Sequence, residues 1–112
     1  MDNNLREEIT HLHAQVCSGL ADTNRILILY TLNEKSLNVS ELSDFLGLPQ
    51  PTTSRHLKVL RDRGLVTAKR DAQSIYYTLT DQRIIQALDL LRAVLNDKLE
   101  AQVQLLLNSA KT

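Results

Sequence analysis

The sequence predicts a mainly α-helical fold that carries one small β-hairpin. Over most of the chain, apolar residues recur every three or four positions, which is the period of a helix that packs on one face. Between residues 65 and 79 the pattern changes to β-branched and aromatic residues, which are typical of strands. With 112 residues, of which 43% are hydrophobic and 23% charged, the chain suits a single domain, 1–112, with its own core.

The N-terminal part is expected to form two helices. The first covers about residues 5–20, because its apolar residues fall on one helical stripe. Asp22 is a suitable N-cap for the second helix, whose segment 26–32 is apolar on nearly every side and is therefore expected to be buried. Residues 33–38 are polar and are expected to form a turn.

The middle of the chain predicts two short helices joined by a tight connection. Ser40 is expected to cap the first of them, and Gly47 to end it in the left-handed conformation. Pro51 fits the first turn of the next helix, which is expected to run to about Arg63 and to stop at Gly64. The side chains expected to turn inward from the first of these helices are Leu42, Phe45 and Leu46.

The remaining elements are a hairpin and a long helix. Residues 65–68 and 74–79 read as its two strands, and Lys69 to Gln73 as a polar tip between them. Thr80 is expected to cap a last helix over about residues 81–107. Its apolar stripe comprises Ile84, Leu88, Leu91, Leu95, Leu99, Val103 and Leu106.

This order of elements is that of a winged helix-turn-helix, with the helix-turn-helix at about 40–63 and the wing at about 65–79. A last helix of over twenty residues with a continuous apolar stripe has little use in so small a monomer. We therefore expect a homodimer, held through the helices at about 5–20 and 81–107.

The distribution of charge favours a nucleic-acid partner although the formal net charge is zero. Residues 49–71 hold six basic side chains and two acidic ones, whereas residues 1–24 hold four acidic side chains and one basic one. A basic segment in an otherwise acidic chain is typical of a DNA-binding face. The alternative is a solvated helix of mixed charge.

The helix at about 51–63 is the expected reader of double-stranded DNA. Its N-terminal residues would reach base edges in a major groove, where arginine can bind guanine with two hydrogen bonds. Two alternatives are that Arg55 is an ordinary surface residue and that His56 packs against the fold. The candidate DNA-binding residues are Gln50, Thr52, Thr53, Ser54, Arg55, His56, Lys58, Lys69 and Arg70.

Other classes of protein find little support. No apolar run approaches the ~20 residues that span a membrane, and the N-terminus lacks the apolar segment of a signal peptide, so a cytoplasmic location is expected. No nucleophile, base and orienting group combine into a catalytic site, so no enzyme is expected. No cofactor is expected, and a metal is left open.

The chain resembles the ArsR/SmtB family of bacterial metal-responsive repressors over roughly residues 14–95. The match is carried above all by Leu48-Pro49-Gln50-Pro51-Thr52-Thr53-Ser54-Arg55-His56-Leu57-Lys58-Val59-Leu60-Arg61, with Val39-Ser40-Glu41-Leu42, Gly64-Leu65-Val66 and Tyr76-Tyr77-Thr78-Leu79. The resemblance implies a repressor that binds a palindromic operator as a dimer, joined through its first and last helices, and leaves it when an inducer binds.

The usual metal sites of that family are absent. The segment 39–45 has no cysteine, and Asp81-Gln82-Arg83 has arginine where the family's last-helix site needs histidine. The candidate sensor is therefore Cys17, with His13 one turn before it, acting on thiol-reactive compounds or soft metals. Two alternatives remain open: Cys17 is a small buried hydrophobe, or the regulator has no small inducer and is constitutive or controlled by a protein partner.

Overall fold

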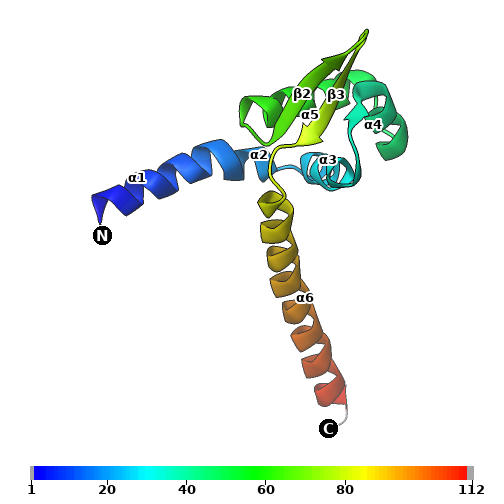
Figure 1. Ribbon diagram of the computed structural model, residues 1–112. Coiled ribbons are helices and arrows are strands. Elements are labelled where there is room, and N and C mark those ends of the chain that lie inside the picture. The colour runs from blue at the N-terminus through cyan, green and yellow to red at the C-terminus, as the bar shows by residue number, and fades with distance from the viewer. Residues whose placement is uncertain (1, 111–112) are drawn as a thin grey trace. The chain divides into compact units, whose positions relative to one another are not determined.

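The computed structural model describes residues 2–110 and contains helices and one small antiparallel sheet (Figure 1). The chain divides into two compact units, one up to Gln82 and one from Arg83 onward. In chain order the elements are α1 (Asn3–Leu12), η1 (His13–Cys17), α2 (Ser18–Leu20), α3 (Thr23–Glu34), β1 (Leu37–Asn38), α4 (Val39–Leu46), α5 (Gln50–Asp62), β2 (Val66–Asp71), β3 (Ser74–Leu79) and α6 (Arg83–Ala110).

The first helix runs without a break from Asn3 to Leu20, but one turn within it is a π-helical turn, η1. Asp2 caps its start by accepting a hydrogen bond from the Asn4 amide. At η1 the Ser18 amide donates to the His13 carbonyl, five residues earlier. Such turns often occur at functional sites.

The core of the first unit is formed by fully buried aliphatic side chains of α3, α4 and α5. These are Ile28, Leu29, Leu42, Leu57 and Leu60. The expectation that segment 26–32 is buried holds for Ile28, Leu29 and Leu32, whereas Leu27 is exposed.

Helix α4 differs from its prediction in two respects. Its N-cap is Asn38 and not Ser40, because Asn38 and Glu41 form a reciprocal capping box at 2.8 and 3.0 Å. Phe45 does not turn inward, since 72% of it is exposed. Gly47 ends the helix in the left-handed conformation, with φ of 68°, as predicted.

The sheet has three strands in the order β1-β3-β2, all antiparallel. Strand β1 was not predicted, and it pairs Leu37 with Tyr77. The wing lies where it was expected, but its first strand is longer: β2 continues to Asp71, so the prediction that Lys69 and Arg70 lie in the tip was wrong. The turn itself consists of Ala72 and Gln73.

Helix α6 begins at Arg83. Thr80 was expected to cap it, but Thr80 instead contacts Leu65 and Thr67. The Thr80 amide donates to the Leu65 carbonyl, and its hydroxyl lies 3.2 Å from that of Thr67. Ile85 and Leu88 are buried, whereas the apolar residues from Leu90 onward are exposed. Within the described residues, no helix has the length and apolar character that a membrane span requires.

Candidate nucleic-acid interface

Within the basic segment, residues 49–71, the N-terminus of α5 is exposed. The Pro49 carbonyl accepts hydrogen bonds from the amides of Thr52 and Thr53, both at 3.1 Å, and Pro51 lies in the first turn. No side chain caps this end, but Pro51 has no N–H and the amides of Thr52 and Thr53 already donate to Pro49, so what this end offers to a phosphate is the positive end of the helix dipole and at most the Gln50 amide.

Four of the predicted side chains lie exposed on α5, namely Gln50, Ser54, Arg55 and Lys58, and Thr52 is half-buried beside them. The Arg55 guanidinium donates to the Thr52 hydroxyl at 3.3 Å, which directs it along the outer face of the helix. Lys58 forms an exposed ion pair with Asp62 at 3.0 Å, and such pairs contribute little to stability. Lys58 can therefore leave Asp62 for a phosphate at small cost.

Thr53 is not available to a DNA partner, and its inclusion among the candidates was wrong. It is fully buried, and its hydroxyl accepts a hydrogen bond from Ser43 at 2.9 Å. It lies on the core face with Leu57 and Leu60, the face the periodicity had predicted. Thr53 therefore fixes α5 against α4.

His56 also faces the protein. Only 15% of its side chain is exposed, and its Nε2 lies 3.8 Å from Oδ1 of Asp22. Of the two sequence interpretations of His56, the structure favours a histidine that packs on the fold.

Asp22 is the N-cap of α3 and accepts hydrogen bonds from the amides of Asn24 at 2.8 Å and Arg25 at 3.3 Å. Burial raises the pKa of Asp22, but these amide hydrogen bonds and the charges of His56 and Arg25 outweigh burial and leave the pKa below its usual value. The Asp22 carboxylate is therefore charged at neutral pH.

Lys69 and Arg70 lie next to each other in β2, so their side chains leave opposite faces of the wing. Lys69 is paired with Tyr76 and Arg70 with Ile75. Both cations are exposed. The wing thus carries one positive charge on each face near its tip. The sequence had instead predicted both residues in the turn.

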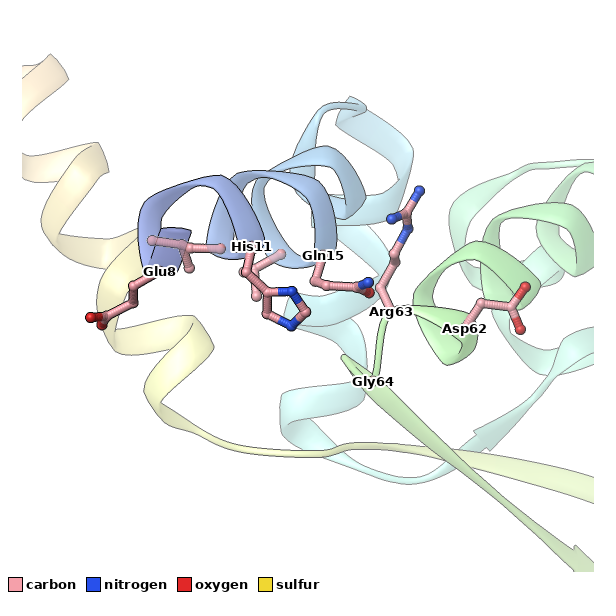
Figure 2. Close-up of a pocket in the computed structure, with 8 residues that line it drawn as sticks. Glu8, His11, Gln15, Asp62, Arg63 and Gly64 are labelled. Carbon is pink, nitrogen blue, oxygen red and sulfur yellow. The ribbon is translucent and has the colours of Figure 1, made fainter. Parts of the chain in front are cut away.

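A groove of about 550 Å³ lies beside the C-terminal end of α5, between that end and the first helix (Figure 2). His11 and Gln15 line it from the first helix, and Arg63 and Gly64 from the other side. Arg63 donates to the Ala14 carbonyl, so the first helix and the end of α5 are directly joined.

The same junction favours glycine at position 19, because any larger residue would force the Leu65 side chain to shift. A Cβ there would lie 2.8 Å from Cδ1 of Leu65, closer than van der Waals contact allows. The helix before α3 therefore packs directly on the residues that follow α5.

Comparison with known proteins identifies the family of this chain. The family model described as "Bacterial regulatory protein, arsR family" matches residues 22–68. The chain is 33% identical to nodulation protein NolR of Rhizobium meliloti over 96 residues, which cover 86% of this chain and 79% of NolR. The chain belongs to the ArsR family. It is thus a DNA-binding transcriptional regulator. The members of its family are regulators and not enzymes.

Two further similar proteins bear on function. The biofilm growth-associated repressor of Xylella fastidiosa is 33% identical over 81 residues, covering 72% of this chain and 71% of the repressor. The solution structure of a homodimeric winged helix-turn-helix DNA-binding domain from Mycobacterium bovis matches with a TM-score of 0.75 and 25% identity, covering 90% of this chain and 93% of that one. The winged helix-turn-helix fold predicted from the sequence is confirmed.

For this ArsR chain, sequence reasoning missed the residues that hold α5 in place. Asp22 was predicted as a cap and His56 as a flank residue, but their proximity depends on the packing of α3 on α5. Gly19 gave a weak signal, as one of only three glycines in the chain.

The candidate sensor residues, Cys17 and His13, lie within η1, and both are exposed. In the single chain Cys17 is exposed, whereas the alternative interpretation has it as a small buried hydrophobe. Among residues 2–110, no three or more histidine, cysteine, aspartate or glutamate side chains gather closely enough to hold a metal ion.

Proposed function

We propose that this chain is a repressor that binds a palindromic operator as a homodimer, with α5 in the major groove. The observation that carries the proposal is the exposed N-terminal face of α5, where Gln50, Ser54, Arg55 and Lys58 lie around a helix end that no side chain caps. Helices present this kind of end to base edges and phosphates. The wing cations Lys69 and Arg70 would add contacts to the DNA backbone.

Exposed apolar stripes support the dimer. Helix α6 leaves Leu91, Leu95 and Leu99 from 49% to 63% exposed, and Leu5 and Ile9 of α1 are about half exposed. Stripes this long are costly in water and mark association surfaces. A second copy of the chain is the proposed partner, as in the homodimeric relative.

A dimer of this kind would place two α5 helices on successive major grooves, ~34–36 Å apart. The two-fold symmetry of the protein is then matched by a palindromic operator. Repression is proposed because a relative of similar length is named a repressor. A bacterial regulator of this kind acts in the cytoplasm, where its DNA lies.

Cys17 is the proposed point of action of an inducer. It is the chain's only cysteine, it is exposed, and it lies in the same π-helical turn as Ala14, whose carbonyl Arg63 of the α5 end contacts. A bulky adduct or soft metal on this thiol would disturb that junction and tilt α5. The second candidate is a regulator with no small inducer. The absence of the family's usual metal ligands from the sequence supports this candidate.

The experiment is a band shift with DNA from upstream of the chain's own gene. We expect a discrete complex that unlabelled operator displaces and scrambled DNA does not, and the absence of such a complex would overturn the proposal. Arsenite, peroxide and polysulfide are then added to wild type and to Cys17→Ser. Release of wild type alone supports Cys17 as sensor, release of both refutes it, and release of neither favours the inducer-free regulator.

A further inference from the structure

The first helix is joined to the rest of its unit near its C-terminal end. No residue of α1 or η1 is buried, whereas Gly19 of α2 is buried. The elements that α1 and η1 chiefly contact are each other and α2. A groove of about 550 Å³ lies between this helix and the end of α5 (Figure 2). The direction in which the helix leaves the core therefore depends on a small number of contacts at the junction.

Arg63, the residue at which α5 ends, bridges this junction with its side chain. Its guanidinium donates a hydrogen bond to the Ala14 carbonyl. Its aliphatic part passes over Gly19, since a Cβ at Gly19 would lie 3.4 Å from Cγ and 3.6 Å from Cβ of Arg63. Arg63 thus contacts the first helix at two points more than one turn apart, which constrains both the position and the direction of the helix.

The π-helical turn makes the Ala14 carbonyl available to Arg63. The Ser18 amide donates to the His13 carbonyl, five residues earlier, and not to the Ala14 carbonyl as it would in an α-helix. The Ala14 carbonyl instead accepts hydrogen bonds from two side chains, the Ser18 hydroxyl and the Arg63 guanidinium. A hydrogen bond from a charged donor is stronger than one between neutral groups. The irregular turn and Arg63 therefore form one connection.

The backbone around Arg63 is fixed to the body that carries the reading helix. The Arg63 amide donates to the Val59 carbonyl at 3.0 Å, and the Leu65 amide donates to the Leu60 carbonyl at 2.9 Å. Leu65 and Leu60 are both buried. The bridge therefore starts from a defined point at the end of α5, and only the Arg63 side chain spans to the Ala14 carbonyl.

We propose that Arg63 is a positioning residue that sets the separation of the two α5 helices in the dimer, and thereby the spacing of operator half-sites that the protein accepts. The inference rests on the proposed function, in which the first helix belongs to the dimer interface. The interface then holds the first helix, and Arg63 holds the winged helix-turn-helix at a defined angle to it. One added base pair moves a half-site by about 3.4 Å and turns it by roughly 35°.

The test uses fluorescence anisotropy with labelled operator whose half-sites are brought closer or moved apart by one base pair. Arg63→Ala is compared with Arg61→Ala, because Arg61 is an exposed arginine in the last turn of the same helix and its loss removes the same charge. Wild type and Arg61→Ala should both prefer the natural spacing. In Arg63→Ala this preference should fall about two- to tenfold, which corresponds to the net contribution of one hydrogen bond.

Two results of this comparison would overturn the inference. The first is an Arg63→Ala protein that keeps the wild-type preference for the natural spacing. The second is an equal loss of affinity for all three spacings together with a lower salt slope, because that result would show that Arg63 contacts a DNA phosphate.

A measurement without DNA separates this inference from the proposed DNA binding. A spin label is attached at position 44, an exposed site on α4, in the variant Cys17→Ser/Asp44→Cys. Pulsed electron paramagnetic resonance then gives the distance between the two labels of a dimer. We expect one narrow distribution in this background and with Arg61→Ala, and a broader or shifted distribution with Arg63→Ala.

The outcomes of the two experiments are distinguishable. Absence of operator binding by wild type would refute the proposed function, while the label distances would still test the role of Arg63. Identical distance distributions with Arg63→Ala and Arg61→Ala would overturn the inference even if the operator is bound. Absence of any distance between labels, as in a monomer, would refute both.

Discussion

The Ser43 hydroxyl donates a hydrogen bond of 2.9 Å to the hydroxyl of Thr53, and both residues are buried. This contact joins α4 to α5, the two helices of the helix-turn-helix. Thr53 lies two residues before Arg55, so the contact sets the position of the DNA-reading end of α5. The orientation of the exposed face thus depends on a polar contact inside the core.

Thr53→Val should reduce the free energy of unfolding by about 1–3 kcal/mol, because it leaves the Ser43 hydroxyl buried without its acceptor. The double variant Ser43→Ala/Thr53→Val removes both partners and should recover part of this loss. Urea unfolding followed by circular dichroism at one fixed protein concentration measures both. A double variant less stable than the sum of the single losses would contradict the assigned pair.

The wing turn carries a strained residue. Ala72 has φ of 56°, a left-handed conformation that glycine adopts without penalty. Ala72→Gly should therefore stabilise the protein by roughly 0.5–1 kcal/mol, and Ala72→Val should destabilise it. Thermal unfolding of the two variants beside wild type checks the turn, and a lower Tm for Ala72→Gly would show that the strain is absent.

Asp22 should contribute to acid sensitivity. Because its pKa is lowered in the folded protein, its charged form stabilises the fold above the carboxyl pKa of the unfolded chain, about 3.9, and this contribution disappears as the pH falls through the lower folded value. Asp22→Asn should flatten the decline in stability below about pH 4. Urea midpoints between pH 3 and 6 measure it, and an unchanged slope in the variant would count against this role for Asp22.

Leu99 tests the association surface on α6. Leu99→Asp places a charge within the exposed apolar stripe and should shift the protein from about twice 12.7 kDa to 12.7 kDa in analytical ultracentrifugation at micromolar concentration. Asp97→Ala, on the opposite side of the same helix, is the matched control and should leave the mass unchanged. A monomeric wild type would contradict the dimer.

The sequence predicted features that depend on local chemistry. Gly47 and Gly64 both have positive φ, at 68° and 74°, as expected of helix stops. The periodicity of α5 placed Leu57 and Leu60 on the buried face. Both inferences need only residue type and spacing along one element.

Features that depend on tertiary packing escaped prediction. Strand β1 has only two residues and exists because Leu37 and Asn38 pair with β3, about forty positions later. Three apolar residues of α4 were candidates for the core, but its eight residues bury Leu42 and expose Phe45. The contact between Asp22 and His56 likewise has no signature in spacing, since it joins two elements far apart in the chain.

Arg55 tests the central claim, that the exposed face of α5 reads the operator, most directly. Fluorescence anisotropy with operator and with single-base variants of it, across a salt series, compares Arg55→Ala with Arg70→Ala. We predict that Arg55→Ala costs about 1–3 kcal/mol on the operator and blurs the preference at one base pair, whereas Arg70→Ala weakens all sequences equally and lowers the salt slope. An Arg55→Ala protein that binds its operator with wild-type affinity and preference would contradict the account.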